Sequence, residues 1–272
     1  MGKTLQGKVV IVTGASSGIG FETARMFAES GCRIVMAARN TDHLYQAGDE
    51  LKKAGYDVLP VQTDVSREED CERLIRKTLD VYGQIDVLVN NAGISMRVLF
   101  GDIELKVFKK IMATNFWGTV YCTKFALPSL LKTKGSVVGV TSIAGIQGLP
   151  GRTAYSASKF AIHGFLETLR LEYKKQDLHV FLIAPGFTRS NIRMAAMTEK
   201  GESQGKSPRN EKRMMSPESV ARCIVKGVRG RQYLKILTWM GIGTFVLRKI
   251  SPRLLDFFTV EIMRREKDSP FH

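Results

Sequence analysis

Tyr155 and Lys159 stand four residues apart in a segment, 154–174, whose apolar residues recur at helical spacing. Side chains at this spacing share one face of a helix, so the ammonium lies near the phenol. A nearby positive charge favours phenolate and lowers the tyrosine pKa from its usual value of about 10. The pair therefore predicts proton transfer at neutral pH. The alternative is a surface pair without a chemical role.

A second candidate site is the segment 13–20, Thr-Gly-Ala-Ser-Ser-Gly-Ile-Gly, between an expected strand and an expected helix. Glycines let the backbone approach a pyrophosphate, and the N-terminus of the helix attracts its charge. Its spacing is GxxxGxG, and a tight turn without a ligand is the alternative. The flanking strand and helix favour a dinucleotide site. Its expected contacts are Gly14, Ser16, Ser17, Gly18, Ile19 and Gly20.

The elements that must position these residues form a regular alternation. Apolar runs predict strands at 9–13, 34–38, 58–61, 87–90, 136–141, 179–184 and 233–238. Segments of helical period predict helices at 18–30, 42–54, 68–82, about 106–127, 154–174 and about 217–227. Strands this apolar are buried on both faces, which indicates a parallel sheet covered by helices on each side. We predict a single-domain, doubly wound α/β fold.

The tail of the chain departs from this alternation. The polar, methionine-dotted segment 191–215 is too long for a plain connection and is predicted to be a mobile lid. We expect a catalytic domain over 1–238 that includes this lid, followed by a helical extension of the same domain over 239–272.

Further motifs stand in a fixed order along the chain. They are Asp64-Val65, Asn90-Asn91-Ala92-Gly93, Asn115, Thr141-Ser142, Tyr155-Ser156-Ala157-Ser158-Lys159 and Pro185-Gly186. With the glycine turn, they resemble the short-chain dehydrogenase/reductase family, in the branch with an Asn-Ser-Tyr-Lys tetrad. The resemblance covers residues 7 to about 190 closely and continues more loosely to 238. It implies a Rossmann fold, oxidoreductase activity and assembly into a homodimer or homotetramer.

The resemblance also implies roles for individual residues. Tyr155 would donate a proton to a substrate carbonyl, Ser142 would hydrogen-bond the substrate oxygen, and Lys159 would also hold the nicotinamide ribose. Asn115, which by itself would be a solvated helical residue, would support a water next to the lysine. The remaining implied cofactor contacts are Asp64, Val65, Asn91, Ala92, Gly93, Pro185, Gly186 and Thr188.

The choice of nicotinamide cofactor depends on the end of the second expected strand. NAD-binding proteins commonly carry an acidic residue there, whereas this strand ends in Ala38 followed by Arg39 and Asn40. The Arg39 guanidinium suits a 2′-phosphate, with Ser16 and Ser17 as further donors. NADP(H) is therefore the predicted cofactor, and a solvated Arg39 is the alternative.

Charge and cysteine content indicate which partners and which cellular compartment to expect for the protein. The formal net charge is +15, and residues 191–272 carry 17 basic and 8 acidic side chains, a net of +9. No aromatic interleaving of the kind that stacks bases accompanies these charges, so we expect no nucleic acid partner. The four cysteines and four histidines are scattered, which argues against disulfides and a metal site. We expect a cytoplasmic protein, because an apolar strand follows a short polar lead without a signal sequence.

The extension carries an uncharged run, 236–247, between basic flanks. Its 12 residues fall short of the roughly 20 needed to span a bilayer. Apolar faces with basic neighbours suit peripheral contact with an anionic membrane, and a core or subunit contact is the alternative. Met194, Met197, Met214 and Met215 of the lid are expected to contact an apolar substrate.

The predicted function is NADPH-dependent interconversion of a ketone and a secondary alcohol on an apolar substrate. The chain resembles hydroxysteroid dehydrogenases and 3-ketosphinganine reductases, which combine NADPH preference with apolar substrates and membrane association, and the segments 148–155 and 159–164 are similar to the latter. A 3-oxoacyl-thioester reductase is the alternative within the family. A non-catalytic dinucleotide-binding protein that docks on membrane or nucleic acid is the alternative outside it.

Overall fold

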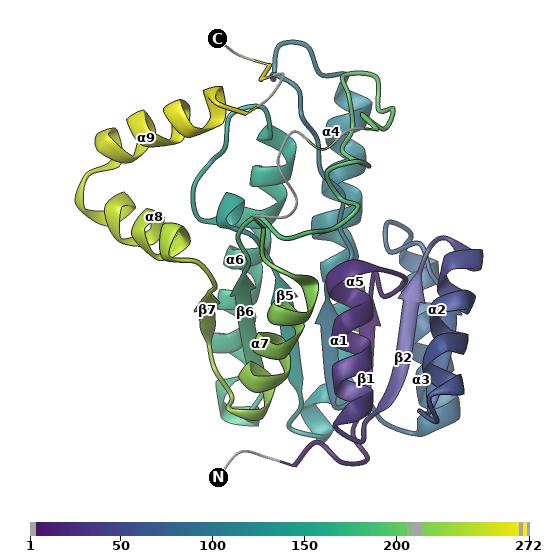
Figure 1. Ribbon diagram of the computed structural model, residues 1–272. Coiled ribbons are helices and arrows are strands. Elements are labelled where there is room, and N and C mark those ends of the chain that lie inside the picture. The colour runs from purple at the N-terminus through teal and green to yellow at the C-terminus, as the bar shows by residue number, and fades with distance from the viewer. Residues whose placement is uncertain (1–3, 206, 208–213, 267–268, 271–272) are drawn as a thin grey trace.

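The computed structural model describes residues 4–205, 207, 214–266 and 269–270. The predicted α/β class is confirmed, because a sheet of parallel strands forms its centre (Figure 1). The described strands are ordered β3-β2-β1-β4-β5-β6-β7. Their bounds are β1 Val9–Thr13, β2 Arg33–Ala38, β3 Val58–Gln62, β4 Val87–Asn90, β5 Ser136–Val140, β6 His179–Ala184 and β7 Leu234–Ile236.

Helices cover both faces of this sheet. Their bounds are α1 Gly18–Glu29, α2 Thr41–Lys53, α3 Glu68–Tyr82, α4 Leu105–Met112, α5 Gly118–Lys132, α6 Thr153–Glu172, α7 Pro217–Arg229, α8 Trp239–Ile250 and α9 Pro252–Arg264. Alternate strand residues point to opposite faces. Val10 and Val12 pack with α1, α2 and α7, whereas Val9 and Ile11 pack with α3, α5 and α6. Both faces are therefore buried, as the apolar strands predict.

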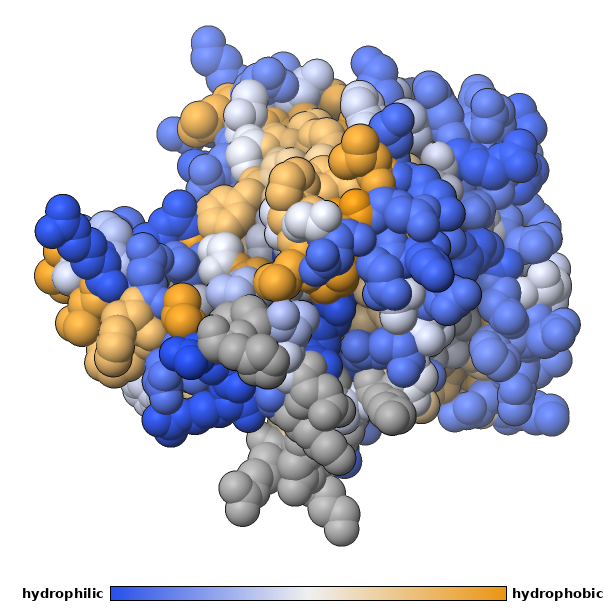
Figure 2. Space-filling model, turned by 90° about the horizontal axis from the view of Figure 1, so that it is seen from above, coloured by the Kyte–Doolittle hydropathy of each residue, from blue (hydrophilic) through white to orange (hydrophobic). Residues whose placement is uncertain are grey.

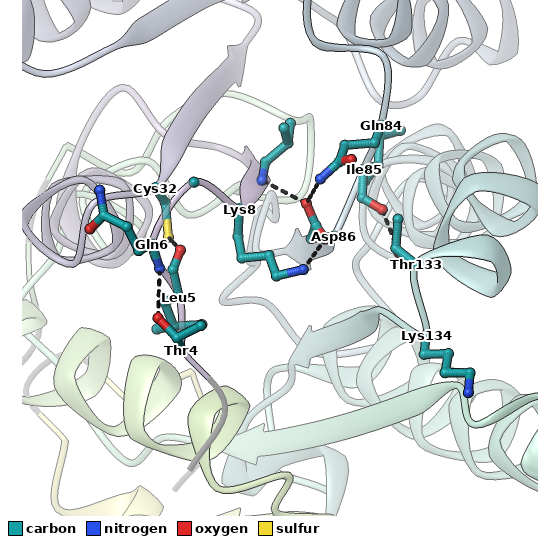
Figure 3. Close-up of polar contacts among 12 residues, drawn as sticks. Thr4, Leu5, Gln6, Lys8, Cys32, Gln84, Ile85, Asp86, Thr133 and Lys134 are labelled. Carbon is teal, nitrogen blue, oxygen red and sulfur yellow. Dashed lines mark hydrogen bonds and ion pairs between the residues drawn. The ribbon is translucent and has the colours of Figure 1, made fainter.

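The amino ends of β1 and β4 are joined by polar contacts at the base of the sheet (Figure 3). The Asp86 carboxylate accepts hydrogen bonds from Lys8 Nζ at 2.8 Å, Val9 N at 2.9 Å and Gln84 Nε2 at 2.7 Å. Asp86 is buried, so these donors compensate the loss of hydration of its charge. The opposite, carboxyl end of the sheet is left for the candidate site.

The helix predicted at 106–127 differs from the structure. It consists of α4, a π-helical segment over Ala113–Trp117 and α5, which continues to Lys132. A π-helical turn adds one residue to the turn and rotates the side chains that follow, and such turns are frequent at functional sites. Asn115 lies in this segment and is fully buried, not solvated as its helical position alone suggests.

The lid predicted at 191–215 is attached to the body in its described part. Met197 N donates to Ser95 O at 2.9 Å, and Met215 N donates to Phe187 O at 3.0 Å. Residues 206 and 208–213 of this segment lie outside the described residues. Met197 is buried in a cluster with Met96 and Val107, so its side chain belongs to the core and not to a substrate contact.

The predicted helical extension begins with α8 directly after β7. Together α8 and α9 form a hairpin that stands beside the carboxyl end of the sheet (Figure 1). Many of its large apolar side chains are exposed, Trp239 at 89% and Ile250 at 74% among them. Within the described part of the chain, no helix is both long and apolar enough to cross a membrane.

Candidate active site

A cavity of about 330 Å³ lies at the carboxyl ends of β5 and β6. Ser142, Tyr155 and Lys159 line it together, as the tetrad predicts. Figure 2 looks down on this end, where apolar side chains gather in the left and centre of the view and the right side is hydrophilic. Predicted cofactor contacts that also line it are Ile19, Asn91, Gly93, Pro185, Gly186 and Thr188.

Ser142 follows β5 and caps a short 3-10 turn over Ile143–Gly145. Its Oγ accepts a hydrogen bond from Ala144 N at 3.1 Å. A serine hydroxyl that accepts a bond still has its own proton to donate. A hydrogen bond between Ser142 and the Tyr155 phenol lowers the pKa of that phenol. The two hydroxyls therefore meet at one point of the cavity.

The pKa of Tyr155 is nevertheless raised above its ordinary value. Burial is the largest cause, and it outweighs the lowering effects of Ser142 and of the charges on Arg152 and Arg193. This differs from the expectation that Lys159 lowers the tyrosine pKa. The Lys159 Nζ lies 5.7 Å from the centroid of the Tyr155 ring, and the positive charges that act on the phenol are those of the two arginines. The phenol is therefore protonated at neutral pH.

Lys159 is buried on the same helix, with 4% of its surface exposed. Its Nζ donates to the carbonyl of Val140 at 2.9 Å. Burial lowers the pKa of this ammonium to about 8, since desolvation disfavours the charged form. The lysine is thus fixed between β5 and α6 and titrates close to neutral pH.

Asn115 lies behind the cavity and joins two of its walls. Its Oδ1 accepts from Ile94 N at 2.8 Å, and its Nδ2 donates to Ile94 O at 3.0 Å and to Ser158 Oγ at 2.9 Å. Ser158 Oγ in turn donates to Tyr155 O at 2.7 Å. Packing therefore does require an amide here, because three polar groups of the loop after β4 and of α6 depend on it.

The glycine turn between β1 and α1 is closely packed. A Cβ at Gly20 would lie 2.1 Å from Gly14 O, and Gly14 and Gly18 have φ of 65° and 56°. Both positive φ values favour glycine over residues with a side chain. Asn91 Nδ2 donates to Thr13 O at 2.9 Å and holds the turn against the end of β4.

Polar groups remain accessible beside this turn. Ser16 is half-buried and Ser17 is exposed, and the Ser17 side chain makes no capping hydrogen bond at the start of α1. Arg39 is exposed at the end of β2. Asn40 has a structural role, because its Oδ1 accepts from His43 N at 2.9 Å and caps α2.

The four remaining predicted cofactor contacts are Asp64, Val65, Ala92 and Thr188, and each also makes contacts within the protein. The Asp64 carboxylate accepts from Ser66 N and Oγ at 3.0 and 2.7 Å. Val65 is buried against Gly118. The Thr188 hydroxyl donates to Gly186 O at 3.1 Å. Ala92, half-buried, follows Asn91 at the edge of the sheet, and its N–H donates to Thr13 Oγ1 at 3.1 Å.

Part of the cavity wall comes from residues that the sequence did not single out. Arg152 and Arg193 line the cavity, and both are buried. The inner sides of α8 and α9 also line it, with Met240 and Met263 as methionines. None of Met194, Met197, Met214 and Met215 is among the described residues that line it. The available signal for Met240 and Met263 is that both lie in segments whose apolar residues recur at helical spacing, which predicts an apolar helix face.

The parallel sheet, the glycine turn and the Ser142–Tyr155–Lys159 arrangement at its carboxyl edge define a doubly wound α/β protein with the site of an oxidoreductase. Residues 8–201 match the model of the family described as short chain dehydrogenase. The chain belongs to this family.

Relatives and solved structures agree with this assignment. The chain is 38% identical over 258 residues to 11-beta-hydroxysteroid dehydrogenase-like 4A of Arabidopsis thaliana, covering 92% of this chain and 83% of that protein. A short chain dehydrogenase/reductase from Burkholderia phymatum, solved in complex with NAD, superposes with a TM-score of 0.83 at 23% identity, over 93% of this chain and 96% of the other. An alcohol dehydrogenase from Thermococcus sibiricus complexed with 5-hydroxy-NADP superposes with a TM-score of 0.75 at 28% identity, over 85% of this chain and 96% of the other.

Proposed function

We propose that this short-chain dehydrogenase interconverts a ketone and a secondary alcohol on an apolar, lipid-like substrate with NADP(H). The observation that carries the proposal is the Tyr155 phenol, hydrogen-bonded to Ser142 in a cavity with apolar walls and with buried Lys159 beside it. These groups suit proton transfer to an oxygen next to an apolar body.

The residues present fit a nicotinamide dinucleotide. The cradle that a Cβ at Gly20 would fill suits the close approach of a pyrophosphate, and the N-terminus of α1 favours its charge. Arg39, Ser16 and Ser17 would hold the 2′-phosphate, since Arg39 and Ser17 are exposed and Ser16 is only half-buried. When bound, the dinucleotide supplies the hydride that adds to the carbonyl carbon.

The side chains of the cavity supply the proton and its control. In the reduction, Tyr155 Oη gives its proton to the carbonyl oxygen, which leaves a phenolate beside Lys159. Ser142 Oγ donates to the same oxygen, because Ala144 N–H occupies only one of its lone pairs and its hydroxyl hydrogen can rotate toward the substrate. The charges of Arg152 and Arg193 stabilise the phenolate. In the oxidation, the phenolate accepts the proton from the alcohol.

The walls of the cavity support a bulky apolar substrate. Leu247 of α8 and Leu255, Phe258 and Ile262 of α9 form an apolar wall opposite the tetrad. The volume lies at the lower end of the range of about 300–1,000 Å³ for ligand pockets. Relatives named 11-beta-hydroxysteroid dehydrogenase-like support a steroid-type ketone, and a 3-ketosphinganine-type ketone is the other apolar candidate.

The test is a panel of ketones with NADPH consumption as the measurement. We expect long-chain or polycyclic ketones to give the highest kcat/KM. Preference for short water-soluble ketones would contradict the substrate class, and preference for 3-oxoacyl thioesters would favour the alternative function. Dinucleotide binding without turnover on any ketone would favour a binding protein.

We also propose peripheral docking of the α8–α9 hairpin on an anionic bilayer. Trp239, Ile250 and Phe257 expose 89%, 74% and 65% of their surface. Exposed Arg248, Lys249 and Arg253 lie around the turn between the helices. Apolar side chains with basic neighbours match the chemistry of an anionic membrane surface.

The architecture of the whole molecule adds two proposals. Residues 1–238 and 239–272 would act as one domain, because α8 and α9 complete the cavity wall. The protein would form a homodimer or homotetramer, which light scattering after size-exclusion chromatography would test.

A further inference from the structure

Helix α9 forms the outer wall of the cavity. Leu255, Thr259 and Met263, each four residues apart, are buried and line it. This spacing places the three side chains on one face of the helix. The opposite face is exposed, with Phe257 at 65% and Leu254 at 45%. A helix that buries only one line of side chains needs further contacts to hold its position against the body.

The described residues provide two polar attachments between α9 and the body. Gln147 Nε2 donates to Asp256 Oδ1 at 3.2 Å near the start of the helix, and this contact is exposed. Glu266 follows the end of the helix, and its carboxylate is 2% exposed. Arg152 Nη2 lies 3.3 and 3.2 Å from its two oxygens, and Arg97 Nε lies 3.5 Å from Oε2.

The buried attachment matters more than the exposed one. Exposed polar contacts contribute little, because water competes for both partners. The Glu266 carboxylate lies between buried Arg152 and Arg97, whose side chain is 10% exposed, so water competes far less, and removing the carboxylate leaves the arginines without this partner. Of the two polar attachments of α9, the one at Glu266 therefore contributes more to holding the helix in place.

The two arginines connect Glu266 to the segments that carry the site. Arg97 lies in the loop after β4, close to Ile94, which is bonded to Asn115. Arg152 directly precedes α6 and stands three residues before Tyr155. Val98 N donates to Gly151 O at 3.0 Å and joins the two loops. The carboxylate thus joins the end of α9 to the loops that precede and hold the tyrosine.

We propose that Glu266 is a positioning residue that holds α9 over the cavity and so sets the preference for large apolar ketones. This inference rests on the proposed ketone reductase activity. Glu266 does not line the cavity among the described residues and does not reach the reacting groups. A small ketone needs only the reacting groups and charges around Tyr155, whereas a large one also needs the wall formed by α9.

The test compares Glu266→Gln with Glu261→Gln in the full-length protein. Gln keeps the shape of the side chain and removes its charge. Glu261 lies on the same helix, and its exposed carboxylate pairs with Arg265 at 2.8 Å, so it is a matched control. We expect Glu266→Gln to raise KM for a large apolar ketone at least tenfold, with kcat and KM for a small water-soluble ketone within twofold of the unaltered protein. Glu266→Asp should restore part of the preference.

A second measurement reads the position of α9 without activity. Hydrogen exchange of the peptide 252–264 should become faster in Glu266→Gln and stay unchanged in Glu261→Gln. Unchanged exchange and unchanged KM would overturn the inference, as would an equal loss on both ketones. If Glu266→Gln does not fold, Arg97→Gln removes the other half of one ion pair and gives the same comparison. Absence of any ketone reduction by the unaltered protein would instead contradict the proposed function.

Discussion

Lys159 Nζ and the carbonyl oxygen of Val140 lie 2.9 Å apart, which fixes the ammonium at the end of β5 inside the cavity wall. Burial at this position lowers the pKa of the ammonium to about 8. The positive charge that is proposed to hold the nicotinamide ribose is therefore present below pH 8 and is lost as the pH rises through that value.

The first prediction follows from this titration. The kcat/KM for NADPH, which reports groups of the free enzyme, should stay constant from pH 6 to about 7 and fall as the pH passes 8. Steady-state rates at fixed ketone concentration provide the measurement. Arg39→Ala should lower kcat/KM at every pH without moving the pH at which it falls, because an arginine guanidinium does not titrate in this range. A flat profile up to pH 9 would contradict the role of Lys159.

Removing the Tyr155 hydroxyl tests the proton donor. Tyr155→Phe should lower kcat by a factor of about 100 or more, the effect typical of losing a general acid. Thermal unfolding and NADPH binding should change little, because the ring remains. Tyr45→Phe on α2, where the ring is 46% exposed, is the control and should be fully active. Substantial activity of Tyr155→Phe would assign the proton to another group.

The predicted cofactor preference depends on Arg39. The unaltered protein should use NADPH with a higher kcat/KM than NADH. Arg39→Ala should reduce this preference by about 1.5–3 kcal/mol, the contribution expected of a charged hydrogen bond. Arg76→Ala, an exposed arginine on α3, should leave the preference intact. Equal use of both cofactors by the unaltered protein would refute the assignment to NADP(H).

Docking of the α8–α9 hairpin can be measured by co-sedimentation with anionic vesicles. The protein should pellet at low salt and be released at high salt, because basic side chains contribute about 1 kcal/mol each near such a surface. The variant Trp239→Ser/Phe257→Ser should bind more weakly. Leu171→Ser removes a side chain that is 62% exposed near the end of α6 and should bind normally. Protein that stays in the supernatant at low salt would favour a subunit contact.

Much of this architecture could be predicted from local patterns. Apolar runs such as 9–13 predict the strands, and the burial of this strand on both faces agrees with its Val and Ile content. The glycine turn is predictable because Gly14, Gly18 and Gly20 stand between an expected strand and an expected helix. Tyr155 and Lys159 were paired because four residues make about one helical turn.

Other features depend on contacts between distant segments. Asn115 is buried within a π-helical turn, and the residue types around it do not predict such a turn. Periodicity indicated that α9 has an apolar face, but not that Leu255 and Met263 close the cavity. Glu266 meets Arg152 across 114 residues, and no spacing rule connects them. The raised pKa of Tyr155 reflects burial, which the distance to Lys159 alone does not reveal.

The central place of β1 has a consequence for how the chain is completed during synthesis. β1 pairs with β2 on one side and with β4 on the other, at Val10↔Val87 and Val12↔Val89. The second edge of the earliest strand stays open until residue 90 has left the ribosome, and an open apolar edge invites pairing with other chains. The nascent β1 is therefore exposed to pairing with other chains until β4 has emerged to cover this edge.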